Sequence, residues 1–228
     1  MVSRAALAAA LTLGPGGALA LDCSVALVLA LDVSSSVDPR EYALQMQGLA
    51  EAFRDEAVIE TILTPPGAGI MVSAFVWSGY QHQEVIVDWR WLGDEAAILN
   101  FAATIAATER RYDHWPTALG RAAAYAAQLQ ARNPLPCRRR VIDISGDGAN
   151  NDGVGPDWHR ARGTFEGLTI NGLVIRGADP DPAVYYRDQV IHGPGAFLEV
   201  IESYADYAPA ILRKLLRELQ PPFAHLLE

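Results

Sequence analysis

Apolar residues gather in six short runs along the chain, separated by segments of different periodicity. The first run, Ser24 to Val33, is almost entirely apolar, which is typical of a strand buried on both faces of a parallel sheet. Glu84 to Trp91 alternates polar and apolar residues and follows the run Gly69 to Trp77 after a short turn, so these two predict an antiparallel hairpin. The remaining predicted strands are 139–144, 168–175 and 197–201.

Between the runs, apolar residues recur at helical spacing. Asp38 and Pro39 have the residue types of an N-cap and a first helical position, and an apolar stripe follows from Tyr42 to Phe53. A similar stripe ending at Leu219 predicts a C-terminal helix. The other predicted helices are 94–107, 117–132 and 157–162, and the first extends over 39–55.

This alternation of strands and helices predicts an α/β fold. We expect a doubly wound, Rossmann-like sheet of six strands, mostly parallel, with one antiparallel edge strand and helices on both faces. The predicted domain spans 21–220, with a short tail at 221–228. Such sheets bind ligands beyond the carboxyl ends of their strands, where Asp32 and Asp147 both lie.

The first 20 residues have the pattern of a secretory signal peptide. Arg4 precedes a short apolar stretch, and Ala18-Leu19-Ala20 has the small-x-small pattern of a cleavage site. That stretch is too short to cross a bilayer, and no later stretch reaches about 18 apolar residues, so we expect no membrane span. The sequence therefore predicts a protein that is free in the periplasm or outside the cell.

Composition and charge exclude several function classes. The formal net charge of −9 does not suit a phosphate backbone, so nucleic-acid binding is not expected. The five histidines lack zinc-ligand spacing such as His-Glu-x-x-His. The two cysteines, Cys23 and Cys137, can form one disulfide in an oxidising compartment.

Oxygen-bearing side chains are concentrated at the predicted strand ends. Asp32, Ser34 and Ser36 offer one carboxylate and two hydroxyls from a single tight loop. Asp147 adds a second carboxylate, and Thr117 adds a hydroxyl from the start of a predicted helix. Hard divalent cations bind oxygen ligands of this kind, so these five residues predict a metal site for Mg²⁺, with Mn²⁺ or Ca²⁺ as alternatives.

These motifs, in this order along an α/β chain, resemble the von Willebrand factor A (vWA) domain. The resemblance extends from about Asp22 to Leu219. More narrowly, three stretches are similar to an exported bacterial branch of this family whose function is unknown. They are Arg139 to Asn151, Ile170 to Leu173 and Tyr185 to Phe197.

Members of the vWA family carry a metal-ion-dependent adhesion site (MIDAS). The resemblance implies that Ser34, Ser36 and Thr117 bind the metal directly, while Asp32 and Asp147 act largely through water. It further implies that one coordination position stays open for an acidic side chain of a partner protein.

The resemblance also implies a sheet order in which the strands ending at Asp32 and Asp147 are parallel neighbours in near-equal register. Cys23 and Cys137 would then meet at the opposite end of the sheet from the metal and form a disulfide. One departure from the family lies at His114-Trp115-Pro116, where glycines are more common. We expect His114 and Trp115 at the rim of the site, together with Asn151.

The function favoured by these observations is a monomeric, non-enzymatic binding module of the adhesion type. A metal-dependent hydrolase or phosphatase with Asp32 as nucleophile is the first alternative, but Ser34 replaces its second acid, and Lys214, the only lysine, lies far from either loop in the sequence. A vWA scaffold without an active metal site is the second alternative.

Overall fold

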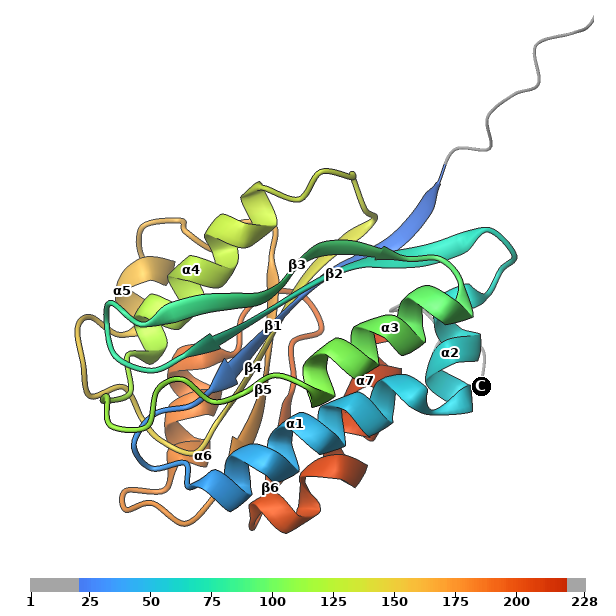
Figure 1. Cartoon of the computed structure of the whole chain (residues 1–228). Coiled ribbons are helices and arrows are strands. Elements are labelled where there is room, and N and C mark those ends of the chain that lie inside the picture. The colour runs from blue at the N-terminus through green and yellow to red at the C-terminus, as the bar shows by residue number, and fades with distance from the viewer. Residues whose placement is uncertain (1–20, 221–228) are drawn as a thin grey trace, which may run out of the picture.

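The computed structural model describes residues 21–220, which form a central sheet covered by helices (Figure 1). The strands are β1 (Asp22–Asp32), β2 (Ala68–Trp77), β3 (Gln83–Leu92), β4 (Arg139–Gly146), β5 (Thr169–Ile175) and β6 (Leu198–Ile201). Their order in the sheet is β3-β2-β1-β4-β5-β6, and only the β2–β3 pair is antiparallel. The predicted sheet is therefore confirmed. The predicted signal peptide and C-terminal tail lie outside the described residues.

Two layers of helices cover the sheet (Figure 1). One face packs against α1 (Pro39–Arg54), α2 (Glu56–Leu63), α3 (Glu95–Ala106) and α7 (Tyr207–Leu219). The other face packs against α4 (Leu119–Ala131), α6 (Pro182–Tyr185) and the π-helical turn Tyr186–Val190, with α5 (Pro156–Arg160) beside α4. No helix within residues 21–220 has the length and apolar character needed to cross a membrane.

The apolar run in β1 is explained by its central place in the sheet. Leu27 and Leu29 point into the core under α1 and α7, whereas Val28 and Ala30 point into the core under α4. Because helices cover both faces of the sheet, β1 does not show the alternation of polar and apolar residues that is typical of a strand with one exposed face.

Several helix boundaries differ by one or two residues from the sequence prediction, and two of these differences have a clear local cause or consequence. Helix α1 ends at Arg54, because the Asp55 carboxylate accepts a hydrogen bond from the Ala57 amide and starts the additional short helix α2. Helix α4 begins at Leu119, so Thr117 lies in the loop before the helix instead of in its first turn.

Cys23 and Cys137 form the predicted disulfide, with their Cα atoms 4.6 Å apart. β1 and β4 pair in parallel from Val25 opposite Arg139, so the two cysteines lie just before the paired region. The disulfide is therefore at the opposite end of β1 from Asp32.

A buried ion cluster attaches α7 to the sheet. The Lys214 ammonium lies 2.7 Å from the Asp143 carboxylate of β4 and 2.6 Å from the Glu218 carboxylate on its own helix. The Asn171 amide of β5 also donates to Glu218, at 2.8 Å. All of these side chains are buried.

Candidate metal centre

The predicted ligand residues meet at the carboxyl ends of β1 and β4, where the strand order reverses. Asp32 is the last residue of β1, and Asp147 directly follows β4. The β1–β4 pairing brings the two strand ends together although they are far apart in the sequence.

Three hydroxyls and a carboxylate form a continuous chain of hydrogen-bonding distances at this edge. The Thr117 hydroxyl lies 3.3 Å from the Ser34 hydroxyl, which lies 3.2 Å from the Ser36 hydroxyl. The Ser36 hydroxyl donates to the Asp147 carboxylate at 2.6 Å. Ser34 and Thr117 are buried, whereas Ser36 is exposed, so the chain of hydroxyls leads from the protein interior to the solvent.

Asp32 lies fully buried beneath these hydroxyls. Its Oδ1 atom accepts a hydrogen bond from the Ser34 amide at 2.7 Å, but its Oδ2 atom has no hydrogen-bond partner among the described residues. Burial, and secondarily the charge of Asp147, raises the pKa of Asp32 to about 8. Burial also raises the pKa of Asp147. Two neighbouring carboxylates that are largely removed from water favour a neutralising cation. The donor set consists only of oxygen atoms, which fits a hard divalent ion.

Within residues 21–220, no three His, Cys, Asp or Glu side chains are grouped in a way that could hold a metal ion. The group described above contributes only two carboxylates, and its other donors are hydroxyls. Any ion bound here would therefore depend on serine and threonine oxygens and on water to complete its coordination.

Two side chains from other elements hold the backbone of the Asp32–Ser36 loop. The buried Gln45 amide of α1 donates to the Asp32 carbonyl at 3.0 Å. The Arg110 guanidinium donates to the carbonyls of Val33, at 3.2 Å, and Ser34, at 3.0 Å. Consecutive carbonyls of the loop are thereby held by fixed donors, which leaves the hydroxyls as the groups that face Thr117 and Asp147.

Asn151 positions Thr117. Its side-chain oxygen accepts a hydrogen bond from the Thr117 backbone amide at 2.8 Å, and its backbone amide donates to the Thr117 carbonyl at 2.9 Å. Asn151 was expected at the rim, but these contacts give it a supporting role for the hydroxyl of Thr117.

The residue before Asp147 is Gly146, and the structure leaves no room for a side chain at this position. A Cβ atom at this position would stand 2.8 Å from Asp32 Oδ2 and 2.5 Å from the Tyr186 hydroxyl oxygen. Tyr186 is fully buried, and burial, followed by the charge of Asp32, raises its pKa well above the usual value. The tyrosine therefore stays protonated, and its neutral hydroxyl lies beside Gly146.

The two aromatic residues before Thr117 occupy different environments. The His114 ring points toward Asp113, with 2.6 Å between Nδ1 and Oδ1, and its side chain is largely exposed. Trp115 stacks on His82 with ring centroids 4.0 Å apart, and its carbonyl accepts a hydrogen bond from the Ser35 amide. Trp115 is 37% exposed and lies beside the loop.

Sequence reasoning missed Gln45, Arg110 and Tyr186. Gln45 is a polar residue on the buried face of α1, next to Met46, and that placement was a usable signal. Tyr186 belongs to the Tyr185 to Phe197 stretch, which carried the family resemblance but no assigned role. Nothing in the local sequence around Arg110 indicates that it reaches Val33 and Ser34.

Several solved structures are similar to this chain. Proximal thread matrix protein 1 from the mussel byssus superposes with a TM-score of 0.65 at 14% identity, covering 86% of this chain and 48% of that one. A structure of the same mussel protein with a zinc-occupied MIDAS motif has a TM-score of 0.62 at 13% identity, covering 86% and 48%. A von Willebrand factor type A protein from Catenulispora acidiphila has a TM-score of 0.60 at 17% identity, covering 87% and 43%.

The pilus adhesin SpaC from Lactobacillus rhamnosus GG superposes with a TM-score of 0.60 at 13% identity, covering 86% of this chain and 30% of the adhesin. The present chain thus spans about half or less of the length of these proteins. At such low identities the similarity concerns the fold alone, and that fold is the vWA fold.

No curated protein matches the sequence. A family model described as "Protein of unknown function (DUF1194)" matches residues 22–223, which is most of the chain. The chain therefore belongs to the DUF1194 family, and it has the vWA fold.

Proposed function

We propose that this chain is a metal-ion-dependent binding module whose divalent cation, Mg²⁺ in the first instance, accepts a carboxylate from a partner protein. Ser34, Ser36 and Thr117 would hold the ion, with Asp32 and Asp147 neutralising it. The observation that carries the proposal is the chain of three hydroxyls that ends at Asp147. It lies beside the buried carboxylate of Asp32, whose Oδ2 atom has no hydrogen-bond partner among the described residues.

The composition of the site favours binding over hydrolysis. Asp32, the nucleophile of the alternative hydrolase, is fully buried, and one of its oxygens already accepts the Ser34 amide. Lys214 is occupied by Asp143 and Glu218 in the core. Burial shields Asp32 from a substrate, and Lys214 is not available to hold a phosphate.

A location in the periplasm or outside the cell is part of the proposal. The disulfide between Cys23 and Cys137 supports it, because such bridges persist in oxidising compartments. Two of the similar structures come from a byssus thread protein and a pilus adhesin, which are consistent with an extracellular binding role.

The direct test is calorimetric titration of Mg²⁺ and Mn²⁺ into metal-stripped protein. Asp32→Ala and Ser36→Ala are expected to abolish or strongly weaken saturable binding. Ser35→Ala is the matched control, because Ser35 lies in the same loop with an exposed side chain outside the hydroxyl chain. Absence of binding by the unaltered protein would leave a vWA scaffold without an active metal site.

The open coordination position requires a second measurement. Bound Mn²⁺ with an exchangeable water enhances the proton relaxation of bulk water, and a carboxylate that replaces this water lowers the enhancement. Titrating an aspartate-containing peptide into the Mn²⁺ complex is expected to reduce the relaxation, while the same peptide with asparagine should not. Equal effects of both peptides would contradict carboxylate binding at the ion.

A further inference from the structure

Tyr186 brings a hydroxyl close to the candidate metal centre, and the proposed function gives this hydroxyl no role. The side chain is fully buried, and its oxygen makes no hydrogen bond with any residue between 21 and 220. Buried polar groups in folded proteins are nearly always hydrogen-bonded, because an unpaired one costs free energy. A buried hydroxyl without a partner beside a candidate site therefore indicates an interaction that belongs to that site.

Two glycines on neighbouring strands make room for the Tyr186 side chain. A Cβ atom on Gly172 of β5 would stand 2.9 Å from Cδ1 of the tyrosine ring. A Cβ atom on Gly146 of β4 would stand 2.5 Å from the hydroxyl oxygen. The ring therefore lies over β5, and the hydroxyl reaches the carboxyl end of β4, directly before Asp147. A side chain on either glycine would displace the tyrosine from this place.

The π-helical turn Tyr186–Val190 fixes the backbone that carries this hydroxyl. The Ile191 amide donates to the Tyr186 carbonyl at 3.0 Å and closes the turn. The Arg160 guanidinium of α5 donates to the carbonyls of Gln189, at 2.7 Å, and Ile191, at 3.2 Å. Turns of this kind are rare and are frequent at functional sites. Tyr186 is thus held in place by elements outside the metal loop.

The Tyr186 hydroxyl lies close to the free oxygen of Asp32. Asp32 Oδ2 and the tyrosine oxygen stand 2.8 and 2.5 Å from the same point, the position of a Cβ atom on Gly146. Both oxygens are buried, and neither has a hydrogen-bond partner in the part of the chain that the structure describes. Oxygens placed so closely around one point can be joined by a hydrogen bond, directly or through one water. The raised pKa of Tyr186 keeps its hydroxyl protonated, so it can act as the donor.

We propose that Tyr186 is a positioning residue of the metal centre, whose hydroxyl donates to Asp32 Oδ2 and fixes this carboxylate for the ion. The Ser34 amide already holds Oδ1 at 2.7 Å, so a hydrogen bond at Oδ2 stops the carboxylate from rotating. It also supplies a donor to a buried carboxylate that must stay ionised beside the cation. Outer hydrogen-bond partners of this kind tune the affinity of metal sites. The inference rests on the proposed function, because it assigns Asp32 to the ion.

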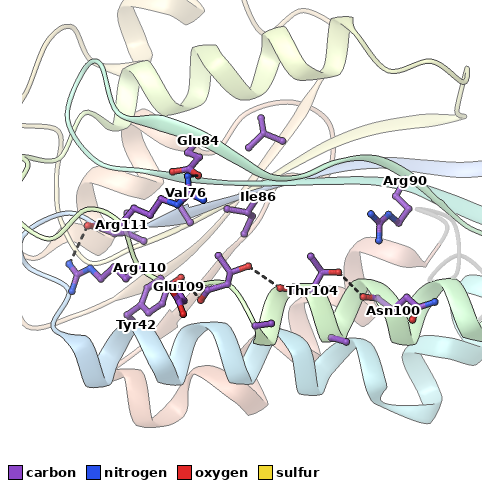
Figure 2. Close-up of a pocket in the computed structure, with 15 residues that line it drawn as sticks. Tyr42, Val76, Glu84, Ile86, Arg90, Asn100, Thr104, Glu109, Arg110 and Arg111 are labelled. Atoms are coloured by element: carbon purple, nitrogen blue, oxygen red, sulfur yellow. Dashed lines mark hydrogen bonds and ion pairs between the residues drawn. The ribbon is translucent and has the colours of Figure 1, made fainter.

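Tyr186→Phe removes the hydroxyl and leaves the ring in its place. It is expected to weaken Mg²⁺ binding by about 10- to 100-fold in calorimetric titration. Tyr42→Phe is the matched control, because Tyr42 is also buried and its hydroxyl donates to the Thr108 carbonyl, at 2.9 Å, instead of to a group of the metal centre. Tyr42 lines a groove of about 910 Å³ between the β2–β3 hairpin and α3 (Figure 2). The control should bind Mg²⁺ as the unaltered protein does.

A second measurement tests the hydrogen bond without any metal. Urea unfolding in EDTA compares the effect of Tyr186→Phe in the unaltered protein with its effect in Asp32→Ala. A hydrogen bond between the two side chains makes their effects non-additive, with a coupling of at least about fivefold in the unfolding equilibrium constant. Tyr42→Phe and Asp32→Ala should be additive. A tyrosine that only fills space would show no coupling between its hydroxyl and Asp32.

Weaker Mg²⁺ binding by Tyr186→Phe, together with coupling to Asp32 in EDTA, would support the inference. Unchanged Mg²⁺ affinity of Tyr186→Phe, additive effects in EDTA, or an equal loss of affinity in Tyr42→Phe would overturn it. Absence of Mg²⁺ binding by the unaltered protein would instead overturn the proposed function. The measurement in EDTA needs no metal, so it decides in either case whether Tyr186 and Asp32 are hydrogen-bonded.

Discussion

Replacing Lys214 by methionine tests the role of the buried ion cluster that attaches α7 to the sheet. Methionine has a similar length and apolar stem, so the change removes the ammonium and leaves most of the packing. The Asp143 and Glu218 carboxylates, 2.7 and 2.6 Å from the ammonium, would then lack their counter-ion in a fully buried place. Loss of one partner from a buried ion pair costs about 3 to 5 kcal/mol. The total free energy of unfolding of a typical domain is about 5 to 15 kcal/mol, so this loss would be a large part of it.

This cost depends on pH, and its sign follows from Glu218. Burial raises the pKa of Glu218 from 4.5 to about 7 even with Lys214 present. A carboxyl whose pKa is higher in the folded state contributes stability below its unfolded pKa and loses that contribution as the pH rises through the folded pKa. Without Lys214, the pKa values of Asp143 and Glu218 rise further. The stability deficit of Lys214→Met should therefore be small near about pH 5 and largest near about pH 8.

Urea unfolding followed by circular dichroism, near about pH 5 and about pH 8, measures this deficit. The double variant Lys214→Met with Glu218→Met removes one unpaired carboxylate and is expected to recover part of the lost stability at the higher pH. A deficit that is equal at both pH values, or below about 1 kcal/mol at the higher one, would show that the cluster does not carry the energy assigned to it.

Three further changes have defined outcomes. Gly146→Ala is expected to abolish metal binding and to lower the melting temperature, since its Cβ would stand 2.8 Å from Asp32 Oδ2; calorimetry and thermal unfolding measure both, and unchanged metal affinity would refute this account of Gly146. Replacing Cys23 and Cys137 by serine should cost about 5 kcal/mol in urea unfolding, because the bridge closes a loop with a sequence separation of 114; a loss below about 1 kcal/mol would contradict it. Because the pKa of Asp32 is raised to about 8, protons should compete with Mg²⁺, so calorimetric affinity should fall by up to about tenfold per pH unit below that value, and a constant affinity would argue against Asp32 as a charge partner of the ion.

Much of the candidate metal centre was predictable from the sequence because its central part is local. Asp32, Ser34 and Ser36 lie within one loop, so their types and spacing are visible without knowledge of the fold. Asp147 was predictable because it follows another apolar strand, and parallel strand ends meet at one edge of the sheet. The sequence did not predict that Thr117 lies before the helix instead of within it. The contacts with Asn151 that hold Thr117 there come from a loop that is distant in the sequence.

The amino-acid sequence by itself determined the class of fold, the order of strands and helices and the location of the candidate site. These follow from periodicities of apolar residues and from capping residues such as Asp38, which act over a few positions. The tertiary structure alone decided that Arg110 holds the metal loop, that Lys214 meets Asp143 in the core, and that α3 leaves a groove beside β3. The physical reason is that hydrogen bonds and ion pairs between distant residues depend on how complete elements pack, and that packing has no signature in the sequence around either partner.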